Sequence, residues 1–162
     1  NGSGSGAEPE GILQMSGIGD VTSNAGAMTF AKAVELETAV AAANADLGSL
    51  AYLTTPGVRG KLKTTEKASS TGQFVWDKNE VNGYRAFAST LVPSNIGSPD
   101  AHAMIFGNWN DLIIAMWGGL DITINPFTYQ TSGDIAIAAL QEVDIKVRHL
   151  ASFAACNDIT SI

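Results

Sequence analysis

The residues that could bind a metal or act as a nucleophile are few and widely spaced. The chain has two histidines, His102 and His149, and a single cysteine, Cys156. A zinc site needs several such ligands together, and a catalytic thiol needs a base and an orienting group beside it. A remote pairing of Cys156 with a histidine is left open by the sequence. The spacing favours structural roles for all three residues, and we expect no catalytic residue, metal or cofactor.

Two pairs of carboxylates could in principle serve acid–base chemistry. Glu35 and Glu37 lie in a predicted helix, where a spacing of two residues directs the side chains apart. Glu142 and Asp144 lie in a predicted strand, where the same spacing places both on one face, as a hydrolase would require. Lys146 continues that face, which is typical of a charge-balanced solvent side. The sequence therefore predicts that the protein is not an enzyme.

Motifs for phosphate binding and acyl transfer are missing from the sequence. The Gly-rich stretch "GIGDVTSNAG" has neither the G-x-G-x-x-G spacing nor a Walker lysine, and no G-x-S-x-G occurs. Trp109 and Trp117, together with Phe106, could stack on a sugar or a base. Their apolar neighbours favour a core or subunit-interface role. A carbohydrate or small-ligand binding module is kept as an alternative.

The charge balance argues against nucleic-acid binding. Nine basic residues stand against sixteen acidic ones, for a net charge of −7. The one basic cluster comprises Arg59, Lys61, Lys63 and Lys67, and it is typical of a solvated helix face more than of a phosphate groove. Charged residues make up 15% of the chain, below the roughly 25% usual for soluble domains. This low surface charge is a mild indication of self-assembly.

Length and patterning describe one domain, or one domain with part of another. No apolar run is long enough to span a bilayer, and "NGSGSGAEPE" lacks the segments of a signal peptide. One cysteine excludes an intramolecular disulfide and fits a reducing compartment. The start lacks Met, so we expect the chain to be part of something longer. Residues 1–6 are either native or a cloning scar.

Two helices and several strands are predicted. A long helix covers 29–47, with Thr29 as its N-cap and Gly48 as its C′ residue, and a short helix covers 55–62, with Thr55 as N-cap and Pro56 at N1. Strands 72–76 and 83–90 should form a hairpin whose loop is too long for the two-residue type. Alternation over 141–148 predicts an antiparallel strand with one wet face. That strand belongs to the long run 134–150, and the other expected strands cover 49–54, 101–108, 112–118, 120–128 and 152–156.

Read in order, several motifs resemble the major capsid proteins of tailed phages with the Hong Kong 97-type fold. "EPEGILQ" is similar to that family's Glu-Pro-x-Gly-Ile-Leu signature. "VNGYRAFAST" resembles its Gly-Tyr-Pro-Val strand, with Arg85 where proline is usual. "AMIFGNWNDLIIAMWGGLDITINPFT" and "EVDIKVRHLASFAAC" resemble its Phe-Gly-Asp-Phe strand and its closing strand. The resemblance covers nearly all 162 residues.

The resemblance implies a fold and a domain plan. The fold class is α+β, mainly antiparallel sheet with one long and one short helix. An axial domain would cover 29–125, and a partial peripheral domain would combine a loop segment at 1–28 with return strands at 126–162. The "NGY" turn would close an axial hairpin, and the Trp and Gly-Gly stretch would be sheet core and turn. The family's N-terminal arm, extended loop and spine helix would all precede Asn1.

The implied function is structural. The chain would be a subunit of a phage or prophage icosahedral capsid that assembles into capsomer rings, encloses packaged DNA without binding its sequence and contacts no membrane. Its place would be the virion capsid, assembled in the bacterial host cytoplasm. An encapsulin-like cellular shell protein is the alternative of the same class. The candidate subunit contacts are Lys61, Lys63, Lys67 and Trp76, with the loop 63–72 near the capsomer axis.

Overall fold

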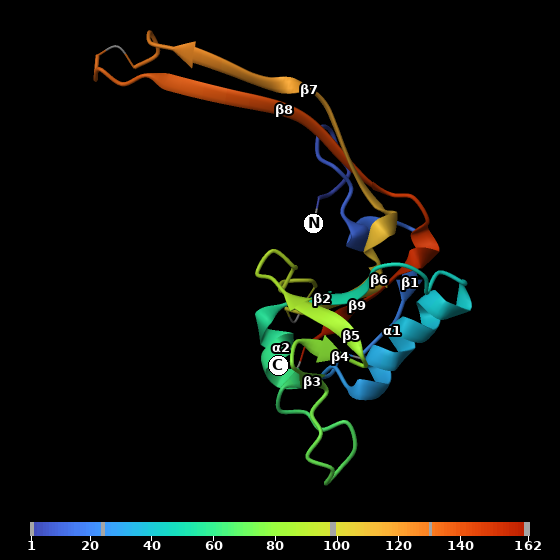
Figure 1. Cartoon of the computed structure of the whole chain (residues 1–162). Coiled ribbons are helices and arrows are strands. Elements are labelled where there is room, and N and C mark those ends of the chain that lie inside the picture. Colours follow the sequence, from blue (N-terminus) through green and yellow to red (C-terminus); the bar gives the residue numbers. More distant parts are fainter. Residues whose placement is uncertain (1, 24, 98–99, 130, 161–162) are drawn as a thin grey trace.

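The chain folds into a body built on one sheet and a long two-stranded ribbon that projects from it (Figure 1). The computed structural model describes residues 2–23, 25–97, 100–129 and 131–160. The seven strands of the main sheet run in the order β1-β9-β6-β2-β5-β4-β3. Their bounds are β1 Gly19–Asp20, β2 Leu50–Thr54, β3 Trp76–Asp77, β4 Glu80–Val81, β5 Tyr84–Ala88, β6 His102–Asn108 and β9 Phe153–Ile159.

Two helices lie on the sheet, and both begin as predicted. In α1 (Phe30–Ala42) the hydroxyl of Thr29 accepts a hydrogen bond from the backbone N–H of Lys32, and in α2 (Pro56–Leu62) that of Thr55 accepts from Val58. The predicted end of the long helix is wrong. Because Asn44 adopts a left-handed φ of 54°, the helix ends before it, and Gly48 lies in the following loop. The α+β class with one long and one short helix is confirmed.

Alternating side chains give the central strands two differently covered faces. Met104 and Phe106 of β6 pack in the cluster under the two helices, whereas Ile105 between them packs in a second cluster. That second cluster is closed by the N-terminal segment, with the 3-10 helix η1 (Ile12–Gln14), and by the base of the ribbon. The sheet is therefore buried on both sides at its centre.

Strands β3, β4 and β5 correct the predicted hairpin of 72–76 with 83–90. Strand β4 lies inside the expected long loop and pairs with both neighbours. Each connection is a two-residue turn, Lys78-Asn79 and Asn82-Gly83, and all four residues have positive φ angles. Turns of this type suit the twist of paired strands, and the second turn has the favoured Asn-Gly sequence.

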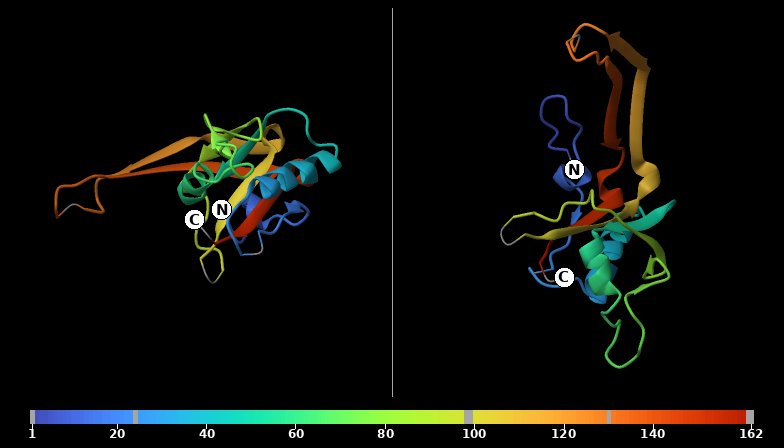
Figure 2. Two further views of the ribbon diagram at one scale, coloured as in Figure 1. Left: turned by 90° about the horizontal axis from the view of Figure 1, so that it is seen from below. Right: turned by 90° about the vertical axis from the view of Figure 1, so that its left-hand side faces the viewer.

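The ribbon consists of β7 (Leu112–Asn125) and β8 (Ala136–Val147). The predicted strands 112–118 and 120–128 are one strand, irregular between Trp117 and Asp121, where Gly118 and Gly119 interrupt the pairing. The expectation that this Trp and Gly-Gly stretch forms sheet core and turn is confirmed in β6, where Met104 and Phe106 are buried, and wrong in the ribbon, where Trp117 is 51% exposed. Apart from its base, the ribbon extends away from the body (Figure 2).

The strand pairing bears on the expected boundary at 125/126. Strands β7 and β8 fall on opposite sides of that boundary, although they pair along most of their length. Strand β9 also falls on the other side from most strands of the main sheet, in which it is paired. The assignment of these segments to axial and peripheral positions stays a prediction. Among the described residues, no helix is long and apolar enough to cross a membrane.

Candidate assembly surface

The ribbon carries most of the protein's exposed large apolar side chains. A two-stranded ribbon on its own is marginally stable in water, and contiguous exposed apolar patches mark interaction sites. These side chains are Ile113, Ile114, Met116, Trp117, Leu120, Ile122, Ile124, Ile137, Leu140 and Val143, with Phe127, Tyr129 and Ile135 in its loop. The ribbon is therefore the candidate interaction surface of this protein.

One face of the ribbon is apolar except at Gln141. Met116 lies opposite Val143, and Ile124 lies opposite Ile137. Between Trp117 and Asp121 strand β7 advances four residues while β8 advances two, and because both steps are even, the faces do not exchange. We call the following set the apolar ribbon face: Ile114, Met116, Ile122, Ile124, Ile137 and Val143, which are 44–70% exposed.

The opposite face is mixed and includes the two carboxylates considered for catalysis. Glu142 lies opposite Trp117, and Asp144 lies opposite Ala115. All of these side chains are exposed to solvent. The predicted division of β8 into an apolar and a charged face is thus present, but both faces are open to water.

The base of the ribbon is fastened to the body through Asp111, in the 3-10 helix η2 (Trp109–Asp111) that precedes β7. Its carboxylate accepts hydrogen bonds from Arg148 Nη2 at 2.6 Å and Nε at 3.1 Å, from Ser152 Oγ at 2.6 Å and from Asn108 Nδ2 at 3.1 Å. The hydrogen bond from Ser152, with that of the Arg148 guanidinium, lowers the pKa of Asp111 despite its burial. The network holds the start of β7 against the end of β8.

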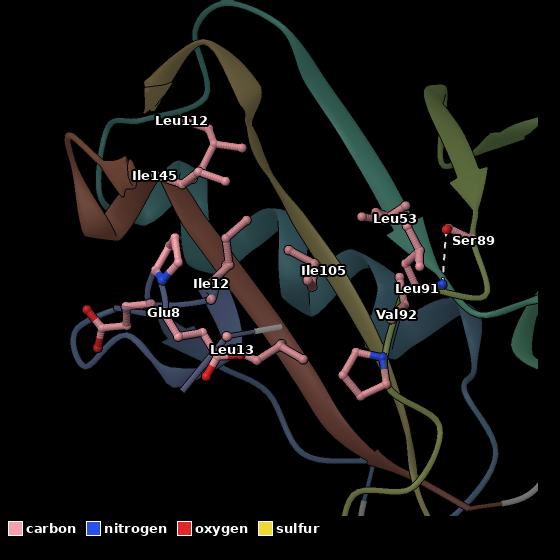
Figure 3. Close-up of a pocket in the computed structure, with 15 residues that line it drawn as sticks. Glu8, Ile12, Leu13, Leu53, Ser89, Leu91, Val92, Ile105, Leu112 and Ile145 are labelled. Atoms are coloured by element: carbon pink, nitrogen blue, oxygen red, sulfur yellow. Dashed lines mark hydrogen bonds between the residues drawn. The ribbon is translucent and has the colours of Figure 1, made fainter. Parts of the chain in front are cut away.

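An apolar cavity of about 660 Å³ lies beside this base (Figure 3). Its walls come from the N-terminal segment, the main sheet, the loop after β5 and the ribbon. Lys146 of the ribbon forms an ion pair with Glu10 of the N-terminal segment at 3.2 Å. The labelled apolar side chains that line the cavity are Ile12, Leu13, Leu53, Leu91, Val92, Ile105, Leu112 and Ile145. Such a lining can hold apolar side chains, with Glu8, Glu10 and Ser89 as the polar side chains in it.

The residues considered for nucleophilic chemistry have separate partners. The Nδ1 atom of His102 lies 2.9 Å from Thr55 Oγ1, and that of His149 lies 3.0 Å from Ser152 Oγ. Cys156 is buried and donates to the carboxylate of Asp158 at 3.2 Å. Burial, with this hydrogen bond, raises the pKa of the thiol to about 12. The described part of the chain contains no group of three or more potential metal ligands.

The aromatic side chains considered for ligand stacking do not form one platform. Phe106 is fully buried against Tyr52, with ring centroids 4.4 Å apart. The indole N–H of Trp109 donates to the backbone oxygen of Ala51 at 3.0 Å, whereas Trp117 lies out on the ribbon.

The carboxylates of α1 are likewise separated by their contacts. Glu35 pairs with Lys32 at 2.7 Å, and Glu37 accepts from the hydroxyl of Tyr84 at 3.0 Å and from the amide of Asn82. Glu35 thus pairs within the helix, whereas Glu37 links the helix to the β4–β5 turn and to β5.

The four predicted subunit contacts differ in their accessibility. Lys61 is half-buried in α2, Lys63 is exposed just after it, and Lys67 places its ammonium 5.5 Å from the centre of the Phe30 ring. Trp76 is 3% exposed and belongs to the core, so it offers little surface to a neighbour. The role of the three lysines stays a prediction.

Sequence reasoning missed the Asp111 network. A signal was present in the sequence, because polar residues flank the two apolar stretches that form the ribbon. Asn108 and Asp111 precede the first stretch, and Arg148 and Ser152 follow the second. Recognising it would have required knowing that these ends meet.

Comparison with known proteins identifies the same family that the sequence motifs resemble. The family model described as "Phage capsid family" matches residues 1–158. The chain is 35% identical over 153 residues to the major capsid protein of Halomonas phage phiHAP-1, a match that covers 94% of the chain and 24% of the phage protein. The chain thus spans about a quarter of the length of this curated relative.

Solved structures with a similar fold include a capsid chain and an encapsulin chain. A capsid chain of an empty GTA particle has a TM-score of 0.67 at 18% identity, covering 96% of this chain and 58% of that one. A chain of the holo-SrpI encapsulin complex from Synechococcus elongatus has a TM-score of 0.60 at 16% identity, covering 92% and 56%. These likenesses confirm the expected Hong Kong 97-type fold.

Proposed function

Because the chain belongs to the phage capsid family, we propose that it is a structural subunit of an icosahedral capsid. Copies would assemble into capsomer rings and a shell that encloses packaged DNA. The observation that carries this proposal is the apolar ribbon face, which has no cover within the described chain. The place of action is the virion capsid, assembled in the bacterial host cytoplasm, and no catalytic step is involved.

The exposed area supports assembly through several contacts at once. Full burial of a large apolar side chain contributes about 1.5–3 kcal/mol, so the half-exposed residues of the apolar ribbon face would contribute roughly 1 kcal/mol each, about 6 kcal/mol for the six. Association costs about 4–15 kcal/mol in lost translational and rotational freedom. One such contact is weak by itself, which favours a closed array in which each copy is held by several neighbours.

The body and the ribbon would serve different contacts in the shell. The loop that follows α2 projects from the end of the body opposite the ribbon tip (Figure 1). We place Lys61, Lys63 and Lys67 of this region toward the capsomer axis, within an axial segment of 29–125, and the segments 1–28 and 126–162 toward the periphery. The net charge of −7 would keep packaged DNA from adhering to the wall.

The test is electron microscopy of the complete reading frame that contains this chain, expressed alone and with its genetic neighbours. We expect rings or closed shells for the wild type. Ile122→Asn with Ile124→Asn should abolish them, because both substitutions place amides on the apolar ribbon face. The matched control is Leu47→Asn, since Leu47 is 76% exposed but lies after α1, away from the ribbon. Shells that form equally well with the ribbon variant would contradict the proposal.

A cellular shell of the encapsulin kind is the second candidate, favoured by the similar fold of an encapsulin chain. The content of purified shells distinguishes the two. Absorbance typical of nucleic acid is expected of a capsid, whereas shells filled with protein would favour the second candidate.

A further inference from the structure

A second cavity, of about 440 Å³, lies on the body between α2 and the strands β3–β5. Three cationic side chains line it: Arg59 from α2, Lys78 from the β3–β4 turn and Arg85 from β5. The carboxylate of Glu80 is the one acidic group in the lining. The site therefore has an excess of two positive charges, three minus one, on a chain whose net charge is −7.

None of the three cations has a side-chain hydrogen bond or ion pair with any residue in the described ranges. Even Glu80, which lies opposite Arg85 in the β4–β5 pairing, forms no ion pair with it. Like charges brought together around a hollow repel one another, and an anion between them removes that repulsion. The arrangement is that of a site for an anion from outside the chain.

Trp76 lies at the same place and gives the site a spectroscopic reporter. It lines this cavity, it is 3% exposed, and its indole Nε1–H is a buried donor with no acceptor among the described residues. The indole ring therefore forms part of the cavity wall, close enough to report on an anion bound beside it.

We propose that Arg59, Lys78 and Arg85 form a carboxylate-binding site, with Trp76 in its wall. Arginine is suited to carboxylates because its guanidinium can donate two parallel hydrogen bonds to them. Nucleic-acid phosphates fit less well, because the cations surround one hollow instead of following a track, and because the chain as a whole is acidic.

The carboxylate can come from a small acid or from an acidic side chain of a second copy. A second copy offers such groups in excess, since acidic residues outnumber basic ones by sixteen to nine. The site itself does not depend on the proposed function, whereas the second-copy source rests on it.

The test follows the indole N–H signal of Trp76 by ¹⁵N NMR on the 162-residue chain, with Trp76→Phe identifying that signal among the three tryptophans. The probe is succinate, titrated at constant ionic strength against chloride and against neutral succinamide, because screening by salt must be held fixed. We expect succinate to shift the Trp76 signal. Arg85→Gln and Lys78→Gln should each weaken apparent binding roughly three- to fivefold, as expected for exposed ion pairs.

The control variant is Lys63→Gln, an exposed lysine that does not line the cavity, and it should bind succinate like the wild type. A second arm raises the protein concentration without added anion. A shift of the Trp76 signal that grows with concentration, and is reversed by succinate and lost in Arg85→Gln, assigns the carboxylate to a second copy. If only succinate acts, the source is a small acid.

Three results would overturn the proposal: no shift in either arm, an equal shift with chloride, or a shift with a DNA duplex but not with succinate. The electron-microscopy results on shell formation, in the ribbon variants or in the wild type, test the proposed function. They do not change the result of the succinate titration.

Discussion

Replacing Asp111 by alanine tests whether its network holds the ribbon to the body. The substitution leaves two buried donors without an acceptor, the hydroxyl of Ser152, which is fully buried, and the amide of Asn108, which is 8% exposed. An unpaired buried donor costs about 1–3 kcal/mol. The side chain of Arg148 is 70% exposed and can be hydrated instead, so its ion pair adds less than about 1 kcal/mol.

The expected loss is about 3 kcal/mol, because the Ser152 hydroxyl can turn toward the neighbouring Nδ1 of His149 and recover part of its hydrogen bonding. The measurement is urea unfolding, with the free energy of unfolding obtained from the midpoint and slope. The matched control is Asp144→Ala. Its carboxylate is exposed on the ribbon and accepts only from the adjacent N–H of Ile145, so a change within about 0.5 kcal/mol is expected.

The same pair of proteins should differ in a pH-dependent way. The pKa of Asp111 is lowered in the folded state, so its stabilisation is fully present above the unfolded value of about 4 and is lost as the pH falls through the folded pKa. The gap between wild type and Asp111→Ala should therefore narrow below about pH 4. A variant as stable as the wild type at pH 7, or a gap that widens in acid, would refute the reasoning.

Two further predictions concern the packing around glycines of the body and the burial of the Cys156 thiol. Gly107→Ala should destabilise by about 3 kcal/mol in urea unfolding, because its Cβ would overlap the ring of Phe153 and lie 2.6 Å from the backbone oxygen of Ser152. Gly60→Ala, in open space on α2, should instead stabilise by up to about 1 kcal/mol, and equal effects of the two would contradict this account. The thiol of Cys156, buried and with its pKa raised to about 12, should react with a disulfide reagent at pH 8 only as fast as the protein opens; fast stoichiometric labelling of the native chain would show otherwise.

Local signals in the sequence were sufficient for several elements. The Thr55-Pro56 pair predicts the start of α2 because a hydroxyl cap and a fixed φ act within one turn of chain. The Asn-Gly pair at residues 82–83 marks a turn for a similar reason, although its two-residue type was not predicted. The order of short motifs was sufficient to identify the family that the comparison confirmed.

Contacts between distant residues needed the tertiary structure. Asp111 and Arg148 are 37 residues apart, and nothing in either local stretch indicates that they meet. The cavity of Arg59, Lys78 and Arg85 likewise depends on how α2 lies against β3–β5. The exposed lysines and arginines of a chain look alike in sequence, because convergence around a hollow is a property of packing.

The ribbon shows where the two kinds of information divide. Alternation along β8 determined from sequence alone that Ile137 and Val143 share a face opposite Glu142, because side chains in a strand point to opposite sides in turn. What covers that face was not determined, since the same pattern suits a buried sheet and a projecting ribbon. Only the tertiary structure decided that the apolar ribbon face is open, because burial depends on which other segments reach it.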